Sequence, residues 1–102
     1  MKKKINKMKN KVETKVIHFL KENWDETCWF EIENINFVGG YDEEGTIEFV
    51  HFETRFGCIK DECNVEKNFE LPLNKLTVNK IFTYLSYASY TEIGNKIFGD
   101  EN

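Results

Sequence analysis

The chain has 102 residues and a net charge of −4; 40% of its residues are hydrophobic, and Pro occurs once. This length fits one domain with one core, and the composition argues against disorder. No stretch approaches the roughly 20 apolar residues that span a bilayer, so we expect no membrane partner. We also expect no signal peptide and a cytoplasmic location, where an odd count of three Cys fits reduced thiols better than disulfides.

The net charge conceals two segments of opposite sign. Residues 1–21 hold eight Lys and one acid, Glu13, for a charge of +7, whereas residues 22–102 carry −11. Such asymmetry between segments indicates a charged partner.

Residues 3–23 have the apolar spacing of an amphipathic helix, because Ile5, Val12 and Val16 recur at three- and four-residue steps along one face. The polar face of the same helix carries a narrow row of cations. We call this row the basic stripe, and it consists of Lys4, Lys7, Lys11 and Lys15.

The middle of the chain reads as strands. Residues 27–38 alternate apolar and polar side chains, with a slip that predicts a bulge near Glu33 and Asn34. Residues 39–45 form a turn signal, and residues 46–56 form a second, antiparallel strand. Residues 57–68 read as a polar loop, and residues 69–71 as a short third strand closed by Pro72.

The helical period returns from Leu73. Residues 75–88 predict a helix, and the sequence from Ser89 to Glu92 matches a capping box, so we expect a new short helix to begin at Ser89. The prediction is a single α+β domain over residues 1–102. Its parts are a basic N-terminal helix at 1–24, a three-stranded antiparallel meander at 27–71, and a C-terminal helix with a short terminal helix at 75–98.

The sequence offers little for catalysis. His18 lies on an exposed helix face, and His51 reaches Cys58 only if the loop after it folds back. Cys58 and Cys63 are too poorly spaced for a usual zinc site, so we read them as loop thiols that pair only if oxidised, and Cys28 as a core residue. We therefore expect no catalytic residue, no metal and no cofactor, and a protein that is not an enzyme.

Our leading hypothesis is a small binding protein that occludes a larger protein with a basic nucleic-acid groove, because its acid-rich body would meet such a groove. By analogy of size and charge, this could be an anti-defence inhibitor of a phage or mobile element (anti-CRISPR-like) or a nuclease immunity protein. The expected contacts combine acids with aromatic rings that are typical of interfaces. They are Tyr41, Asp42, Glu43, Glu44, Asp61, Glu62, Tyr84 and Tyr87.

Two alternatives use other surfaces. In the first, the basic stripe docks on nucleic acid or on an acidic protein. Nucleic acid is the less expected ligand because the remaining −11 repels it. In the second, the chain forms a homodimer through the N-terminal helix or the helix that carries the tyrosines.

Overall fold

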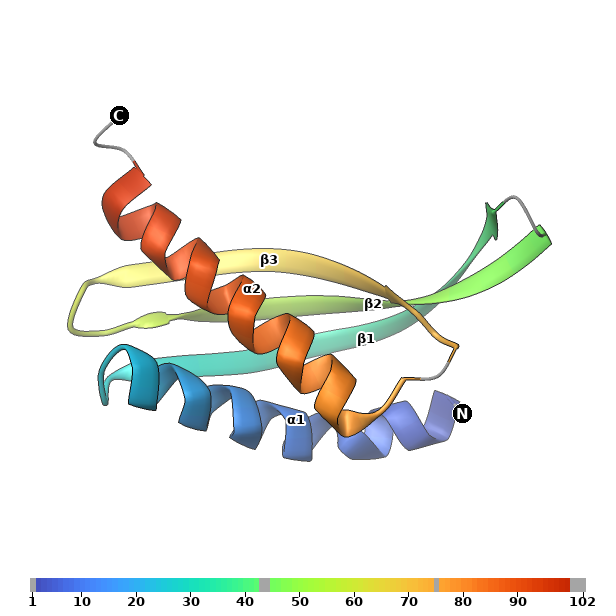
Figure 1. The fold of residues 1–102 in the computed structure, drawn as a ribbon, viewed down its shortest axis with the longest axis horizontal. Helices are drawn as coiled ribbons and strands as arrows, with labels where there is room; N and C mark the ends of the chain where they lie inside the picture. The colour runs from blue at the N-terminus through green and yellow to red at the C-terminus, as the bar shows by residue number, and fades with distance from the viewer. Residues whose placement is uncertain (1, 43–44, 75, 100–102) are drawn as a thin grey trace.

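The computed structural model describes residues 2–42, 45–74 and 76–99, with the backbone only at residues 2, 41, 42 and 45–47. The chain runs through α1 (Lys2–Asn23), β1 (Cys28–Asp42), β2 (Gly45–Cys58), β3 (Cys63–Pro72) and α2 (Val78–Phe98). The strands form one antiparallel sheet in the order β1-β2-β3, with a helix before and after it (Figure 1). The predicted α+β class and meander are confirmed.

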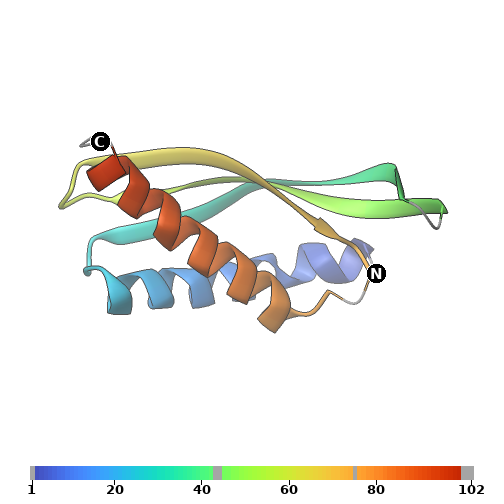
Figure 2. The same ribbon diagram turned by 45° about the horizontal axis from the view of Figure 1, so that its top comes forward.

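Both helices pack on the same face of the sheet, so the molecule has two layers (Figure 2). Along β2 the even-numbered residues 50–58 are buried beneath the helices, whereas Phe49, His51, Glu53 and Arg55 on the other side are only partly buried. This alternation is what a strand with one covered face requires, because successive side chains point to opposite sides. We call the uncovered side the open face.

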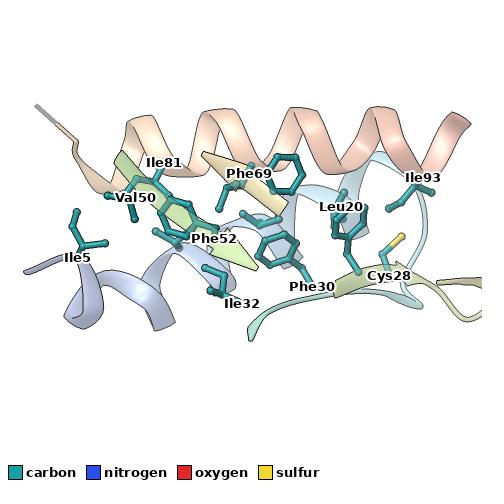
Figure 3. Close-up of a cluster of buried hydrophobic side chains, with 14 of the residues drawn as sticks. Ile5, Leu20, Cys28, Phe30, Ile32, Val50, Phe52, Phe69, Ile81 and Ile93 are labelled. Atoms are coloured by element: carbon teal, nitrogen blue, oxygen red, sulfur yellow. The ribbon is translucent and has the colours of Figure 1, made fainter. Parts of the chain in front are cut away.

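The core lies between the sheet and the helices (Figure 3). The helix α1 contributes its apolar stripe, in which Val12, Val16 and Leu20 are buried. At the centre the ring of Phe56 stacks between Phe30 and Phe69, with centroid distances of 5.9 and 6.3 Å. Each such ring buries a large apolar area, which makes this layer the main source of folding free energy.

The predicted bulge in β1 is confirmed, because the register with β2 shifts between Ile32 and Asn34. The extra residue changes which residues face the helices. Before it Phe30 and Ile32 are buried, and after it Ile35 and Phe37 pack against the same core. The bulge therefore keeps one face of β1 apolar despite the slip in its pattern.

The sheet is longer than the sequence predicted. Strands β1 and β2 pair as far as Asp42 and Gly45, so the turn expected at residues 39–45 is wrong for residues 39–42 and 45. Strand β2 ends at Cys58 and β3 begins at Cys63, so residues 57–58 and 63–68 of the predicted loop belong to strands. Polar side chains such as Asn64 and Glu66 caused this error, because they belong to the open face, where a strand needs no apolar residue.

The helix α2 continues to Phe98, so the separate short helix predicted at Ser89 is wrong. Ser89 is fully buried within the helix, and its buried neighbours Ile81, Leu85 and Ile93 recur every four residues. That spacing shifts the buried stripe by about 40° at each step. This gradual rotation of the buried stripe suits a helix that crosses the strands diagonally (Figure 1). In the sequence alone, the same rotation looks like the end of one helix and the start of another.

Replacing Ser89 by Ala is expected to raise the free energy of unfolding by about 0.5–1.5 kcal/mol. The buried Ser89 hydroxyl has no hydrogen-bond partner within the described part of the chain, and Ala is the better helix former. Urea unfolding measures the change. The control is Thr77→Ala, because Thr77 caps α2 by accepting from the backbone N–H of Lys80 at 3.2 Å, and its loss should cost about 1 kcal/mol. A loss of similar size for Ser89→Ala would contradict this assignment.

Candidate functional site

The open face gathers carboxylates from all three strands. We call these five residues the acidic sheet face: Glu31, Glu33, Glu53, Glu66 and Glu70. The only formal cation that the described strands place among them is Arg55. Neither helix covers this side of the sheet (Figure 2). Four of the five residues are exposed, and Glu53 is partly buried.

Arg55 lies at the middle of the acidic sheet face. Its Nε is 3.4 Å from the Glu66 carboxylate and its Nη1 is 4.0 Å from the Glu33 carboxylate, so it bridges β3 and β1. On the same face His51 Nδ1 lies 3.0 Å from the Glu70 carboxylate. Exposed ion pairs of this kind contribute little to stability. One arginine also leaves the five carboxylates with a surplus of negative charge.

Apolar side chains accompany this charge. Trp29 on β1 and Phe49 on β2 are half-buried positions of the open face, and Val38 is 44% exposed. Aromatic anchors surrounded by charged residues are typical of protein–protein interfaces. The open face therefore combines a negative potential with apolar contact area.

Of the four loop acids and Asp42 predicted as contacts, the structure describes the side chains of Asp61 and Glu62. Asp61 and Glu62 are exposed in the turn between β2 and β3, at the end of the sheet opposite the β1–β2 hairpin (Figure 1). Asp61 also accepts a hydrogen bond from the Trp24 indole N–H at 2.5 Å, so it has a structural role. In the hairpin, Glu43 and Glu44 lie outside the described residues, as do the side chains of Tyr41 and Asp42.

The predicted tyrosines lie on α2 and are exposed, Tyr84 by 44% and Tyr87 by 58%. Each ring also packs edge-on against an aromatic neighbour. Tyr84 meets Phe69 of β3 at a centroid distance of 5.8 Å, and Tyr87 meets Phe19 of α1 at 4.8 Å. Both line a groove of about 590 Å³ between α2 and β3. We call this the β3 groove.

The basic stripe belongs to the helical layer. Lys4, Lys7, Lys11 and Lys15 are all exposed on α1, and none of them takes part in an ion pair within the described part of the chain. The Lys15 ammonium lies 5.5 Å from the centre of the Phe82 ring on α2. The basic stripe and the acidic sheet face thus lie on different layers of the molecule.

The cysteines depart from the prediction of unpaired thiols. Cys28 and Cys58 form a disulfide between directly opposed residues of β1 and β2, so Cys58 is not bonded to Cys63. Closing a loop of this length is worth roughly 3–4 kcal/mol in the chain-entropy account. Cys63, opposite Cys58 on β3, is free and buried, and burial raises the pKa of its thiol.

The residues considered from sequence for catalysis or metal binding do not form a site in the described structure. His51 projects from the open face, whereas Cys58 lies on the covered face within the disulfide, so the two are not brought together. Among the described residues, one group has the spacing to hold a metal ion: Asp25, Cys28 and Cys58. The disulfide removes the two thiolates from this group. The pKa of Asp25 is lowered, chiefly because the Thr27 side chain donates a hydrogen bond to its carboxylate.

Comparison with protein-family models, with curated proteins and with solved structures finds no match to this chain. Its function must therefore be argued from the surfaces themselves. Within the described residues, neither helix has the length and apolar character needed to cross a membrane.

The structure gives Glu13 a role that sequence reasoning missed. Glu13, the single acid among the first 21 residues, accepts a hydrogen bond at 2.7 Å from the backbone N–H of Ile32, beside the bulge. A side chain of α1 thus accepts a hydrogen bond from a backbone N–H of β1 at the point where the pairing of β1 with β2 is irregular. The signal in the sequence for this role was a single acid within a lysine-rich helix.

Replacing Glu13 by Ala is expected to lower the free energy of unfolding by about 1–2 kcal/mol, because it leaves the Ile32 N–H without its acceptor. The matched control is Glu22→Ala, which removes the same charge from an exposed site on α1 and should change stability by less than about 0.5 kcal/mol. Chemical denaturation of both variants decides the point. Equal effects would mean that the Glu13 hydrogen bond contributes nothing beyond its charge.

Proposed function

We propose that this chain is a small protein-binding module that acts by covering a basic surface of a larger protein. The observation that carries the proposal is the acidic sheet face, a side of the sheet that neither helix covers and that holds five carboxylates around one arginine. A face of this sign steers a cationic partner toward it and repels an acidic one. Trp29 and Phe49 supply the apolar contact that charge alone does not.

The partner that this chemistry fits best is a protein with a basic groove for nucleic acid. Carboxylates on a sheet can bind the Lys and Arg side chains that otherwise hold phosphates, because carboxylates and phosphates both accept charge-assisted hydrogen bonds. By analogy of size and charge, the class we propose is an anti-defence inhibitor of the anti-CRISPR kind or a nuclease immunity protein. We propose the cytoplasm as the location because such partners work there; the Cys28–Cys58 disulfide removes the argument from reduced thiols.

We propose a binding role and not an enzymatic one. His18 pairs with Glu22 on α1, His51 pairs with Glu70 on the open face, and the free Cys63 is buried on the covered face. A nucleophile needs a base within hydrogen-bond reach, and these three groups lie on different sides of the molecule.

A second candidate function rests on the basic stripe. Four lysines in register, exposed and outside the ion pairs of the described residues, could bind nucleic acid or an acidic protein. The acidic sheet face lies on the opposite layer, so its repulsion does not prevent approach from the α1 side.

Two variants separate these functions when each is used as bait in extract of the host cell. The first carries Gln at all five positions of the acidic sheet face, and the second is K4Q/K7Q/K11Q/K15Q. The proposal predicts that the first loses the captured protein and the second keeps it, with capture by the natural chain falling as salt rises. Circular dichroism checks that both variants fold.

Retention by the first variant together with loss by the second would overturn the proposal in favour of the basic stripe. A third variant, D42N/E43Q/E44Q, tests the contribution of the β1–β2 hairpin. If only this variant loses the partner, the hairpin carries the function and the acidic sheet face does not.

A further inference from the structure

The two edge strands of the sheet, β1 and β3, differ in how regular and how accessible their outer backbone groups are. On β1 the strand is interrupted by the bulge, and the N–H of Ile32 is taken by Glu13 of α1. On β3 the register with β2 runs without a shift from Phe49 opposite Pro72 to Cys58 opposite Cys63. No described strand pairs with the other side of β3. This edge therefore presents a regular row of backbone groups that another strand could use.

The β3 groove runs beside that edge. Its floor is formed by β3 residues around Phe69, and its wall by the side of α2 that carries Tyr84 and Tyr87. Both rings are supported from behind by Phe69 and Phe19, yet about half of each remains exposed. A free strand edge next to a helix that lines a groove is the arrangement that accepts an added peptide strand.

The charge around the edge selects the kind of peptide. Glu66 and Glu70 project from β3 on the open face, and Glu92 stands on the α2 side of the groove. Lys67 is the cation of the groove itself, and its ammonium lies 2.9 Å from the Glu92 carboxylate. Arg55 of β2 is the second cation beside this edge, 3.4 Å from the Glu66 carboxylate. Three carboxylates against two cations leave a negative excess, which favours a cationic strand.

The acidic sheet face is continuous with this edge. Glu66 and Glu70 belong to that face and also to β3, which is an edge strand. A partner that binds the acidic sheet face can therefore reach the outer backbone groups of β3 as well.

We propose that the β3 groove binds an extended, Lys- or Arg-bearing segment of the partner protein, which joins β3 as a fourth strand. Side chains of an added strand alternate between the two faces. Apolar side chains of the segment lie against Tyr84 and Tyr87, and its cationic side chains reach Glu66 and Glu70. The inference rests on the proposed function, because the same partner covers the acidic sheet face.

A second copy of this chain fits the edge less well. Two β3 strands paired with their open faces on one side bring Glu66 and Glu70 of one copy toward the same residues of the other. Like charges across a strand pair are destabilising. The covering strand is therefore expected to be of opposite charge.

The probe is a capped peptide of about eight residues that alternates Lys with Val and Phe, titrated into the ¹⁵N-labelled chain. We expect amide shift changes along β3 and the facing side of α2, and intermolecular nuclear Overhauser contacts to the β3 backbone. The same peptide with Glu in place of Lys should bind at least roughly tenfold more weakly. A peptide with alternate backbone nitrogens methylated should bind as weakly, because it cannot complete the ladder.

Variants of the chain localise the site. Tyr87→Ala and Tyr84→Ala should each weaken the Lys peptide by roughly three- to tenfold. Tyr90→Ala is the matched control, because Tyr90 is an exposed tyrosine of α2 that packs on Phe19 and Trp24 outside the groove. The affinity of the Tyr90→Ala variant for the Lys peptide should be unchanged.

The inference is overturned if the Lys peptide does not bind, if the methylated peptide binds equally well, or if the shift changes map away from β3. A dimer whose contacts join β3 to β3 would assign the edge to a second copy. Failure here is separable from failure of the proposed function. If the tyrosine variants still capture the host partner and the Gln variant of the acidic sheet face does not, the function stands and the strand addition is wrong.

Discussion

Two helices share one face of a three-stranded sheet, and none of the elements that the structure describes covers the other face (Figure 2). This placement explains why β2 alternates between buried residues such as Phe52 and partly exposed residues such as Arg55. It also requires the bulge in β1, because without the extra residue Ile35 and Phe37 would face solvent. The acidic sheet face, the β3 groove and the distant basic stripe all follow from the same arrangement.

The covered face supplies the stability and the open face the charge. Aromatic stacking around Phe56 and the Cys28–Cys58 disulfide both lie on the covered side. Carboxylates on the open side add little to stability, since one arginine does not balance five acids. Clusters of like charge lower the stability of a protein. They are nevertheless common at binding surfaces, where the needs of function oppose those of stability.

The sequence predicted what periodicity can encode and missed what depends on contacts between strands. The helix α1, the bulge and the meander order were all read from spacing. The early start of β3 was missed because Asn64, Glu66 and Asn68 look like a loop until they are placed on a face that needs no apolar residue. The acidic sheet face was missed for the same reason, since its members come from three strands. The pairing of Cys28 with Cys58, and the burial of Ser89, likewise depend on register and crossing angle.

Hydroxyl-radical footprinting of the free chain tests the central claim that the open face is uncovered. The account predicts rapid oxidation of Trp29, Phe49 and His51 on the open face, and protection of Phe30, Phe52 and Phe56 beneath the helices. Oxidation of both sets at similar rates would contradict the one-sided core. Protection of Trp29, Phe49 and His51 in the free chain would contradict the proposed binding surface, because a face that is already covered is not available to a partner.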